Sequence, residues 1–357
     1  MRRRLVLVAL VVLVALAGCA ETFENDPGDS IEETSGGDTQ QPADEGSGED
    51  PGKTDPTPGT LEVHHIDVGQ AGATLVVTPE EETILVDTGD WQSDGEGVIT
   101  YLEEHGIERI DHLVATHPHA DHIGGHAAVI EYFEEEAGGI GALYDPGQPH
   151  DTQTYENYLD AVDAYGHELL LVEEGDKLPL DSGSVEALVL NPPAGDTGGD
   201  LHRNAMSLAI EFGDVRYLLT GDIESTGEAR LVEEWAEELD ADIYQAGHHG
   251  SSTSSTERFL DAVDPEVAVV SSGYDSQFGH PHDEVLERFA ERDVETYWTG
   301  VHGDVVVTTD GVDIDVTPGA AFSTDPMDLL AEKPGGGRVA QRAAVSRVDT
   351  RPARRAG

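Results

Sequence analysis

The sequence predicts an α/β fold in which two mixed sheets face each other and helices cover both outer faces, a four-layer αββα sandwich. Two observations lead to this class. Apolar segments of strand length alternate with helical segments between residues 61 and 318, and the pattern restarts near residue 207, so that two similar halves follow each other. About 260 residues arranged in this way fit a single large domain.

The predicted elements follow one another in a regular order. In the first half we expect strands at 61–67, 73–78, 83–87 and 112–116, with helices at 95–105, 124–136 and 154–165. In the second half we expect strands at 207–212, 215–220, 241–247, 266–272, 294–298, 304–309 and 312–316, with helices at 224–238, 255–263 and 283–292. The strand at 112–116 runs directly into a histidine-rich loop, so chemistry is expected at its end.

The chain is strongly acidic. Asp and Glu number 73 against 19 Lys and Arg, which gives a formal net charge of −54. More than half of the basic residues lie near the two ends of the chain, so the stretch between them has few positive charges. The carboxylates of that stretch repel one another unless salt screens them. We therefore expect a halophilic surface, with a surface for cationic partners as the alternative. The pattern excludes the basic stripe of a conventional nucleic-acid-binding module.

The N-terminus has the pattern of an export signal. Three arginines precede an apolar run from Leu5 to Ala17, and Leu16-Ala17-Gly18-Cys19 resembles a lipobox. The run is shorter than the roughly 20 residues of a membrane span. Residues 1–19 are therefore predicted to be a lipoprotein signal peptide with Cys19 lipidated, which would anchor the protein to the outer face of the cytoplasmic membrane. The alternative is a plain signal peptide or a signal anchor.

Two more segments lie outside the predicted domain. Residues 20–60 are dominated by small, acidic and hydroxyl-bearing residues and by proline, which predicts a disordered acidic tether. Residues 319–357 become rich in Arg and Ala, which predicts a disordered basic tail. Cys19 is the only cysteine, so a disulfide within the chain and a Cys-based zinc site are both excluded. Any metal ion must be held by His, Asp or Glu.

The strongest chemical signal is the segment THPHADHIGG at 116–125. Within six residues it brings together three imidazoles and a carboxylate, those of His117, His119, Asp121 and His122. Zinc accepts these donors where thiolates are absent, and manganese and iron accept them too. In an extended loop His117 and His119 point the same way, whereas Asp121 and His122 turn with the start of a helix toward a second ion.

Three later segments add further polar groups after predicted strands. LTGD places Asp222 after one strand, GHHGS at 247–251 follows the next, and GHP places His280 in a later loop. We expect one histidine of GHHGS to be the last metal ligand and favour His248. Asp121, His249 and His280 are then assigned as catalytic residues.

Together these motifs resemble the ComEC-like hydrolases of the metallo-β-lactamase superfamily, a group related to the extracellular domain of a DNA-uptake protein. The resemblance covers about 61–310 and rests on IDVGQ, ILVDTG, THPHADHIGG, Asn204 with Ser207, LLTGD, GHHGS and GHP. It implies an αββα fold and a binuclear site. The implied ligands are His117, His119, Asp121, His122, Asp222 and a histidine of GHHG, taken as His248. The resemblance also implies that Asp67 and Asp87 support the metal loop.

Two features depart from the family pattern. The family reads GQGDA where this chain reads GQAGA at 69–73, so an acid is missing and a different substrate range is expected. Full ligand sets of the superfamily also carry another histidine before the bridging aspartate, for which His150, His167 and His202 are the candidates. Without it, one metal ion would be held loosely. The residues assigned to the substrate are Asn204, Ser207 and Ser251.

The expected cofactors are two divalent ions, zinc first, with manganese or iron as alternatives. A metal ion lowers the pKa of bound water from about 15.7 toward 7, so hydroxide becomes available at neutral pH. The first hypothesis is an exported phosphodiesterase or nuclease-like enzyme with DNA as the substrate that the resemblance implies. The second is a hydrolase of a small-molecule ester, lactone or phosphoester. The third is a surface protein that binds metal or ligand without turnover.

The acidic composition argues against DNA, because Lys and Arg normally contact the phosphates. Molar salt weakens that objection, since its ions already screen both partners. No feature of the sequence identifies a protein partner.

Overall fold

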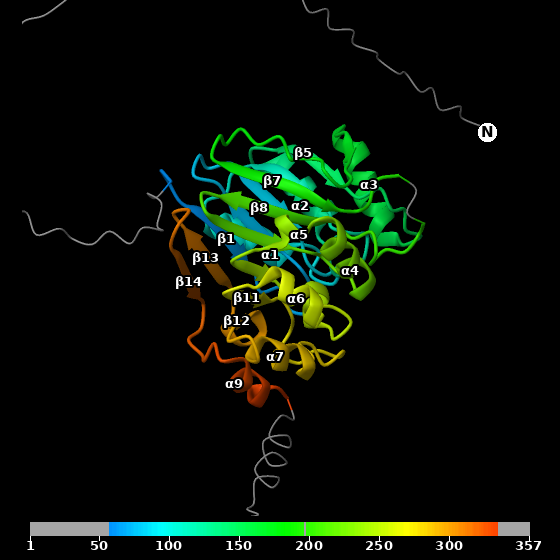
Figure 1. Ribbon diagram of the computed structural model, residues 1–357. Coiled ribbons are helices and arrows are strands. Elements are labelled where there is room, and N and C mark those ends of the chain that lie inside the picture. The colour runs from blue at the N-terminus through cyan, green and yellow to red at the C-terminus, as the bar shows by residue number, and fades with distance from the viewer. Residues whose placement is uncertain (1–56, 196–197, 335–357) are drawn as a thin grey trace, which may run out of the picture. The chain divides into compact units, whose positions relative to one another are not determined.

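The structure, a computed structural model, describes residues 57–195 and 198–334 (Figure 1). The predicted signal peptide with Cys19, nearly all of the predicted tether and residues 335–357 lie outside these ranges. Among the described residues, no helix is both long enough and apolar enough to cross a membrane.

The first sheet has eight strands in the order β14-β13-β1-β2-β3-β4-β5-β6. Its strands are β1 (Leu61–His65), β2 (Thr74–Val77), β3 (Thr83–Val86), β4 (Ile110–Val114), β5 (Ile140–Asp145), β6 (Leu169–Leu171), β13 (Val305–Thr309) and β14 (Ile314–Pro318). The strands from β3 to β6 run parallel to one another, and the remaining neighbours pair antiparallel.

The second sheet has six strands in the order β12-β11-β10-β9-β8-β7. Its strands are β7 (Val185–Asn191), β8 (Ser207–Phe212), β9 (Val215–Leu219), β10 (Ile243–Gln245), β11 (Val267–Val270) and β12 (Glu295–Trp298). The strands from β9 to β12 are parallel. Carboxyl ends of parallel strands meet at one edge of a sheet, and that edge is where polar ligands bind in open α/β sheets.

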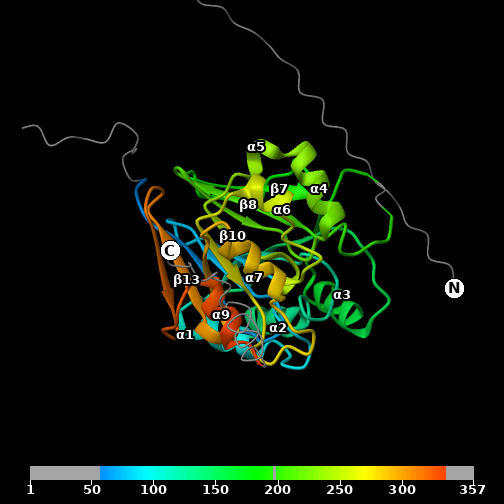
Figure 2. The ribbon, with the colours of Figure 1, turned by 60° about the horizontal axis from the view of Figure 1, so that its bottom comes forward.

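Helices cover the outer face of each sheet (Figure 2). The helices on the first sheet are α1 (Glu96–Glu104), α2 (His126–Glu136) and α3 (Gln153–Tyr165). The helices on the second are α4 (Ser225–Glu234), α5 (Ala236–Leu239), α6 (Glu257–Val263), α7 (Asp283–Ala290) and α9 (Pro326–Glu332). A short helix, α8 (Thr299–His302), follows β12.

Strand periodicity explains the layers. Successive side chains of a strand point to opposite faces, so each strand feeds two cores. In β9, Tyr217 packs into the core between the sheets, whereas Leu218 packs into the core under α4–α7. In β2, Val76 faces the other sheet and Leu75 faces α1–α3. The αββα fold class predicted from the sequence is thus confirmed.

Several predicted boundaries were wrong. Strands β5, β6 and β7 fall in stretches where no strand was predicted. The predicted helix at 224–238 is divided into α4 and α5 at Trp235, whose backbone leaves the helical region with φ −127° and ψ 29°.

The predicted disordered tail at 319–357 also needs correction. Its first part is ordered and includes α9, which begins at Pro326 with the Asp325 side chain accepting from Met327 N at 2.8 Å. Leu329 and Leu330 are buried in the core of the second sheet. The apolar burial explains why the chain does not leave the domain at Pro318.

Candidate metal centre

The histidine-rich segment 116–125 forms a tight loop between β4 and α2. Its backbone turns where the N–H groups of His122 and Ile123 both donate to the carbonyl of His119. Gly124 is required there, because a Cβ on it would lie 2.0 Å from the backbone nitrogen of Trp91. The loop therefore packs backbone against backbone on residues 88–91, and its ligand-bearing side chains start from a fixed position.

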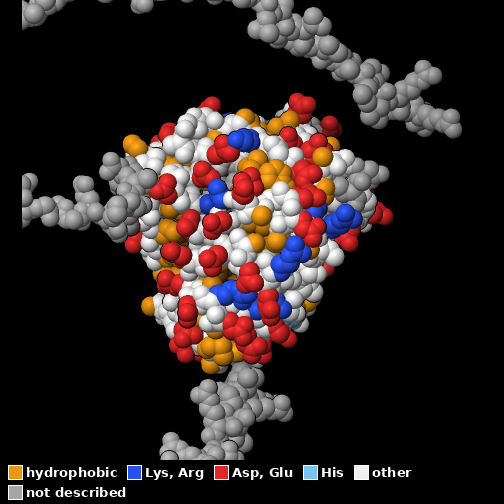
Figure 3. Space-filling model, viewed as in Figure 1, with side chains coloured by type: hydrophobic (Ala, Val, Ile, Leu, Met, Phe, Trp, Pro, Cys, Tyr) orange, Lys and Arg blue, Asp and Glu red, His pale blue; other side chains and the backbone are white. Residues whose placement is uncertain are grey.

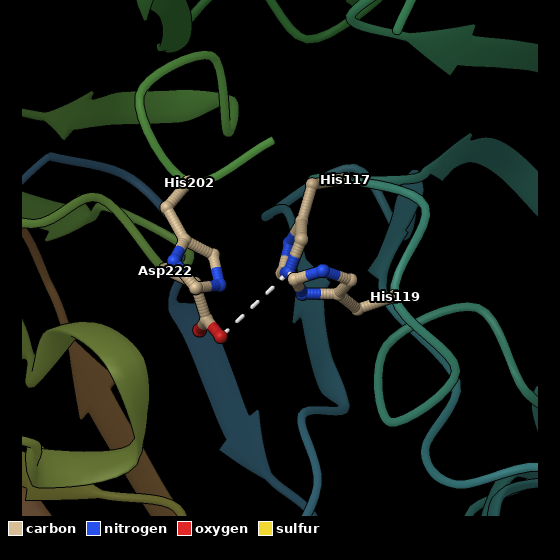
Figure 4. Close-up of side chains that lie close together, drawn as sticks. All are labelled: His117, His119, His202 and Asp222. Atoms are coloured by element: carbon tan, nitrogen blue, oxygen red, sulfur yellow. Dashed lines mark hydrogen bonds and ion pairs between the residues drawn. The ribbon is translucent and has the colours of Figure 1, made fainter. Parts of the chain in front are cut away.

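The first group of donors lies on the loops that follow β4, β7 and β9. His117, His119, His202 and Asp222 each offer one atom, and these atoms all lie within 4.8 Å of one another. Figure 4 shows His117 and His119 on one side of the group and His202 with Asp222 on the other. The Nε2 atom of His117 is 3.6 Å from Oδ2 of Asp222.

The second group consists of Asp121, His122 and His249, again within 4.8 Å of one another. Nε2 of His249 lies 3.1 Å from Nε2 of His122 and 3.4 Å from Oδ2 of Asp121. The other oxygen of Asp222, Oδ1, lies 3.3 Å from Nε2 of His122. The Asp222 carboxylate therefore faces both groups.

Contacts behind the site hold the imidazoles in place. Nδ1 of His117 is 3.1 Å from Oγ1 of Thr116, and Nδ1 of His249 is 2.9 Å from the carbonyl of Ser271. Nδ1 of His122 contacts Asp87. Because Nδ1 is engaged in all three rings, Nε2 is the atom left to face the centre, as in metal sites with an ordered outer layer of hydrogen bonds.

The charges of the site favour a cation. Burial alone would raise the pKa of Asp222, but the neighbouring His122 and His249, whose own pKa values are raised, hold that pKa well below its usual value. Burial lowers the pKa of His117 well below its usual range. Two ionised carboxylates, those of Asp121 and Asp222, thus lie beside a neutral imidazole in a site largely shielded from water.

The residues present fit a divalent metal ion. Imidazole nitrogens and carboxylate oxygens are the donors that zinc, manganese and iron accept in sites without thiolates. Buried carboxylates are stable only when positive charge compensates them. The two groups around Asp222 supply donors of these types, and a bound cation would compensate the charge of their carboxylates.

The structure places the two consecutive histidines of GHHGS in different groups of donors. His249, and not His248, joins Asp121 and His122, whereas His248 groups with His202 and Glu224 nearer the surface. Both histidines have left-handed backbones, with φ 50° at His248 and 57° at His249. Each such conformation costs on the order of 1–3 kcal/mol, and strain of this kind concentrates at functional sites. The geometry turns both rings toward Asp222.

Of the three candidates for the further histidine, His202 is the one that lies in the first group of donors. Its ring centroid lies 4.9 Å from that of His119 and 6.1 Å from that of His117. His150 approaches only His119, with ring centroids 5.7 Å apart, and His167 pairs with Glu134 at 3.0 Å. The first group of donors thus has three histidines.

The three residues assigned to the substrate are all buried in the structure. The Asn204 side chain is fully buried, and its Nδ2 donates to the carbonyls of Gly198 and Asp200. Ser207 is fully buried as well, with its hydroxyl 3.4 Å from the carbonyl of Thr220. Ser251 is buried and contacts Thr253. These side chains stabilise the loops that carry the ligands, and none of the three faces solvent.

His280 lies at the edge of the site. Its ring stacks at 6.3 Å from that of His249, and its Nδ1 is 3.1 Å from Nε2 of Gln70. Burial lowers the pKa of His280 to about 3, so the ring is neutral. Beyond this stacking, no described hydrogen bond joins the His280 side chain to a donor, so the catalytic role predicted from the sequence stays a prediction.

The aspartates expected to support the metal loop behave differently. Asp87 contacts the loop directly, as expected. Asp67 does not, because it is exposed and its carboxylate accepts from the N–H of Gly69 in its own turn. Gly72 occupies the place of the family's missing acid, and a Cβ there would lie 3.2 Å from Nδ1 of His122. The missing acid would therefore have been a neighbour of the metal centre.

Two contributors were missed from the sequence. The Ser271 carbonyl follows β11 and orients His249, and Glu224 follows Asp222 by two residues and faces His248. Ser271 lies just past a buried parallel strand, and this position was the signal that could have indicated a role at the site.

Comparison with known proteins agrees with this geometry. The sequence profile described as "Metallo-beta-lactamase superfamily" matches residues 66–274, which is more than half of the chain. The chain belongs to the metallo-beta-lactamase superfamily. Because the match contains the loop at 116–125, Asp222 and His249, the two groups of donors lie within the superfamily's domain.

Among curated proteins, the chain is similar to ComE operon protein 3 of Bacillus subtilis, with 29% identity over 68% of this chain and 32% of the relative. It is also similar to competence protein ComA of Neisseria gonorrhoeae, with 31% identity over 66% of this chain and 30% of the relative. These relatives show that the domain is ComEC-like, as the motifs predicted. The chain spans about a third of their length.

Among solved structures, the chain resembles CmlA, a diiron β-hydroxylase from Streptomyces venezuelae, with 18% identity and a TM-score of 0.44 over 70% of this chain and 54% of that chain. We conclude from the superfamily match and the donor groups that the protein is a metal-dependent hydrolase of the metallo-beta-lactamase superfamily.

Proposed function

We propose that the protein is an exported, lipid-anchored phosphodiesterase with two divalent metal ions, and that its substrate is DNA or a related phosphodiester. One observation carries the binuclear part of this proposal. The two oxygens of Asp222 lie 3.6 Å from Nε2 of His117 and 3.3 Å from Nε2 of His122, so one carboxylate serves two groups of donors. Two-metal sites suit displacement at a phosphodiester, where both the attacking and the leaving oxygen need stabilisation.

Each residue of the centre has a defined part in this mechanism. His117, His119 and His202 would hold one ion, Asp121, His122 and His249 the other, and Asp222 both. Bound there, the ions would supply Lewis-acid activation and a hydroxide nucleophile at neutral pH. Asp87 and Ser271 keep the imidazoles oriented from behind. His248 is half-buried at the mouth of the site, between Asp222 and Glu224, where a substrate can reach it.

DNA is proposed because the motifs resemble those of a DNA-uptake protein. The names of two relatives, "Competence protein ComA" and "ComE operon protein 3", are consistent with that resemblance. The match covers only about a third of each relative, so the activity of a whole relative is no more than a proposal for this chain. The membrane anchor is supported by the sequence pattern around Cys19. Anchored in this way, the domain would act at the outer face of the cytoplasmic membrane.

One observation favours a small-molecule ester, lactone or phosphoester as the alternative substrate. The described residues include nine Lys and Arg, and seven of these form ion pairs with carboxylates: Arg109, Lys177, Arg216, Arg230, Arg258, Arg292 and Lys333. On the face seen in Figure 3, acidic side chains are spread widely among the basic ones. Such a surface gives a DNA backbone few cations to contact.

The test compares three substrates with the full-length protein in molar KCl with added zinc or manganese. We expect hydrolysis of single-stranded DNA and of bis(p-nitrophenyl) phosphate, and little hydrolysis of p-nitrophenyl acetate. Asp222→Ala serves as the control and should abolish turnover of each substrate that the wild type accepts. Rapid hydrolysis of the acyl ester with both phosphodiesters intact would replace the proposal with the small-molecule alternative.

A further inference from the structure

A hollow of about 530 Å³ lies directly beside the metal centre. Its lining includes Asp121 of the second group of donors, so a molecule in the hollow touches the edge of the reaction site. The other lining residues that matter here are Gln70, Trp91, Gln92, Gln277 and Phe278. None of these residues is used by the metal centre.

Two aromatic rings flank the hollow and are open to solvent. Trp91 and Phe278 are each 57% exposed, whereas large apolar side chains elsewhere in the described domain are mostly buried. They come from segments far apart in the chain, one following β3 and the other in the loop between β11 and α7. Two exposed aromatic faces beside one hollow indicate a place for a flat, aromatic ligand.

Hydrogen bonds hold the backbone of both residues in place. The N–H of Trp91 donates to the carbonyl of Ala120 at 3.1 Å, inside the region where Gly124 packs against residues 90 and 91. The N–H of Phe278 donates to Oγ of Ser276, and its carbonyl lies 3.2 Å from Nε2 of His282. Little backbone conformational entropy is therefore lost when a ligand stacks on these rings.

The polar lining matches a nucleobase better than a phosphate. No Lys or Arg lines the hollow, and Asp90 and Asp121 both contribute carboxylates, which repel phosphate. Gln70 is anchored by its Nε2, 3.1 Å from Nδ1 of His280, while its Oε1 is buried without a hydrogen-bond partner. An exocyclic amine or ring N–H of a base would satisfy that oxygen.

We propose that this hollow binds one base of a single-stranded nucleic acid, stacked on Trp91 and Phe278 and hydrogen-bonded to Gln70, next to the phosphodiester that is cleaved. The inference rests on the proposed function and narrows it to single strands, because a base inside a duplex offers no free face. Stacking is tolerant of sequence. Stacking also depends less on salt than phosphate contacts do. This suits a domain in which most of the described Lys and Arg side chains are paired with carboxylates.

The test measures binding without cleavage, using full-length protein stripped of metal by a chelator in molar KCl. The probes are a fluorescently labelled deoxyadenosine octamer, an abasic octamer of equal charge, and the octamer in duplex form. We expect the wild type to bind the single strand at least tenfold more tightly than the other two. Trp91→Ala and Phe278→Ala should each weaken that binding roughly tenfold, and Trp91→Phe should restore most of it.

Phe322→Ala is the matched control, because Phe322 is also an exposed aromatic, at 41%, but does not line the hollow. Equal binding of the abasic octamer, or wild-type binding by both alanine variants, would overturn the inference. The two proposals fail separately. DNA cleavage with base-independent binding would remove the base site and keep the phosphodiesterase. Base-dependent binding with no cleavage by the metal-loaded protein would keep the base site and remove the phosphodiesterase.

Discussion

Oδ2 of Asp87 lies 2.6 Å from Nδ1 of His122, and the same carboxylate accepts from both the N–H and the hydroxyl of Thr116 at 2.8 and 2.7 Å. One buried side chain at the end of β3 therefore orients a donor of the metal centre and fixes the start of the loop that carries the others. Asp87 itself has a left-handed backbone, with φ 60°.

Replacing this carboxylate should weaken metal binding without removing a ligand. In Asp87→Asn one carboxylate oxygen becomes an NH₂ group, which must face either the Nδ1–H of His122 or the N–H of Thr116. One of these two contacts is therefore lost, and His122 or its loop is held less firmly. We expect metal affinity to fall by about 10- to 100-fold, measured by competition with a chromophoric chelator. Asp163→Asn, on the exposed face of α3, is the control and should leave the affinity unchanged. Unchanged affinity in Asp87→Asn would show that the contact has no orienting role.

The two neighbouring histidines of GHHGS should differ sharply in metal content. His249→Ala removes a donor of the second group, so we expect the bound metal to fall from close to two ions per chain to close to one. His248→Ala should keep close to two ions, because His248 lies outside both groups around Asp222. Elemental analysis after dialysis distinguishes the variants. If His248→Ala lost one ion and His249→Ala kept both, His248 would be the ligand, as assigned from the sequence.

Asp145, at the end of β5, should make stability depend on pH. Its burial raises the pKa of the carboxyl to about 6, against which the N–H of Gly147 acts only in part. The folded state therefore holds this proton more tightly than the unfolded chain does. The resulting stabilisation is complete below the unfolded pKa near 3.8 and is lost as the pH rises through about 6.

Asp145→Asn should remove this dependence while keeping an acceptor for Gly147. We expect the variant to unfold like the wild type near pH 4 and to be more stable at pH 8, by up to about 3 kcal/mol. Urea unfolding at several pH values measures the difference, and Asp163→Asn controls for the loss of one surface charge. A difference that did not grow between pH 4 and 8 would mean that Asp145 is ionised at little cost in the folded protein.

Salt should stabilise the fold. At 0.01 M salt the Debye length is roughly 30 Å, so repulsion among the carboxylates acts across the whole domain. We expect the melting temperature to rise steeply from dilute buffer to molar KCl, and bound metal to reduce the loss at low salt, because divalent cations offset the charge of Asp121 and Asp222. An uncharged osmolyte at equal osmolarity is the control. A melting temperature constant from 0.1 to 3 M KCl would contradict the halophilic prediction.

Lipidation of Cys19 is tested by where the protein fractionates. Cys19→Ser should move the protein from the membrane fraction to the medium or block its processing, because the substituted residue cannot carry the lipid. A Ser30→Ala variant, outside the lipobox, should fractionate like the wild type. Membrane association of Cys19→Ser with an uncleaved N-terminus would indicate a signal anchor instead.

The sequence was most informative where chemistry requires particular residue types. The donors His117, His119, Asp121 and His122 could be predicted because so few side chains bind metal, and their spacing follows from the turn that they share. The choice between His248 and His249 could not, because it depends on two consecutive left-handed backbones rather than on composition. The buried role of Asn204 was hidden for a similar reason, since its partners are backbone carbonyls.

Elements were missed where local signals were short or contradicted by their surroundings. Strand β6 has only three residues and pairs with β5 alone, so its formation depends on the sheet rather than on its own propensity. Helix α9 has a clear start in Asp325-Pro326, but it precedes a tail of different composition. Its two buried leucines, seen only in the fold, decide that it stays with the domain.

An ion bound by the donors around Asp222 would also cross-link the chain. His122 and His249 are 127 residues apart in sequence, yet their Nε2 atoms lie 3.1 Å apart, one on a loop of the first sheet and one on a loop of the second. An ion shared by such residues closes a very long loop, and in the chain-entropy description a covalent link over a comparable span is worth about 4–5 kcal/mol. The cofactor would then tie the two halves of the sandwich together. Stripping it should speed unfolding more than it slows folding, since contacts so distant in sequence form late.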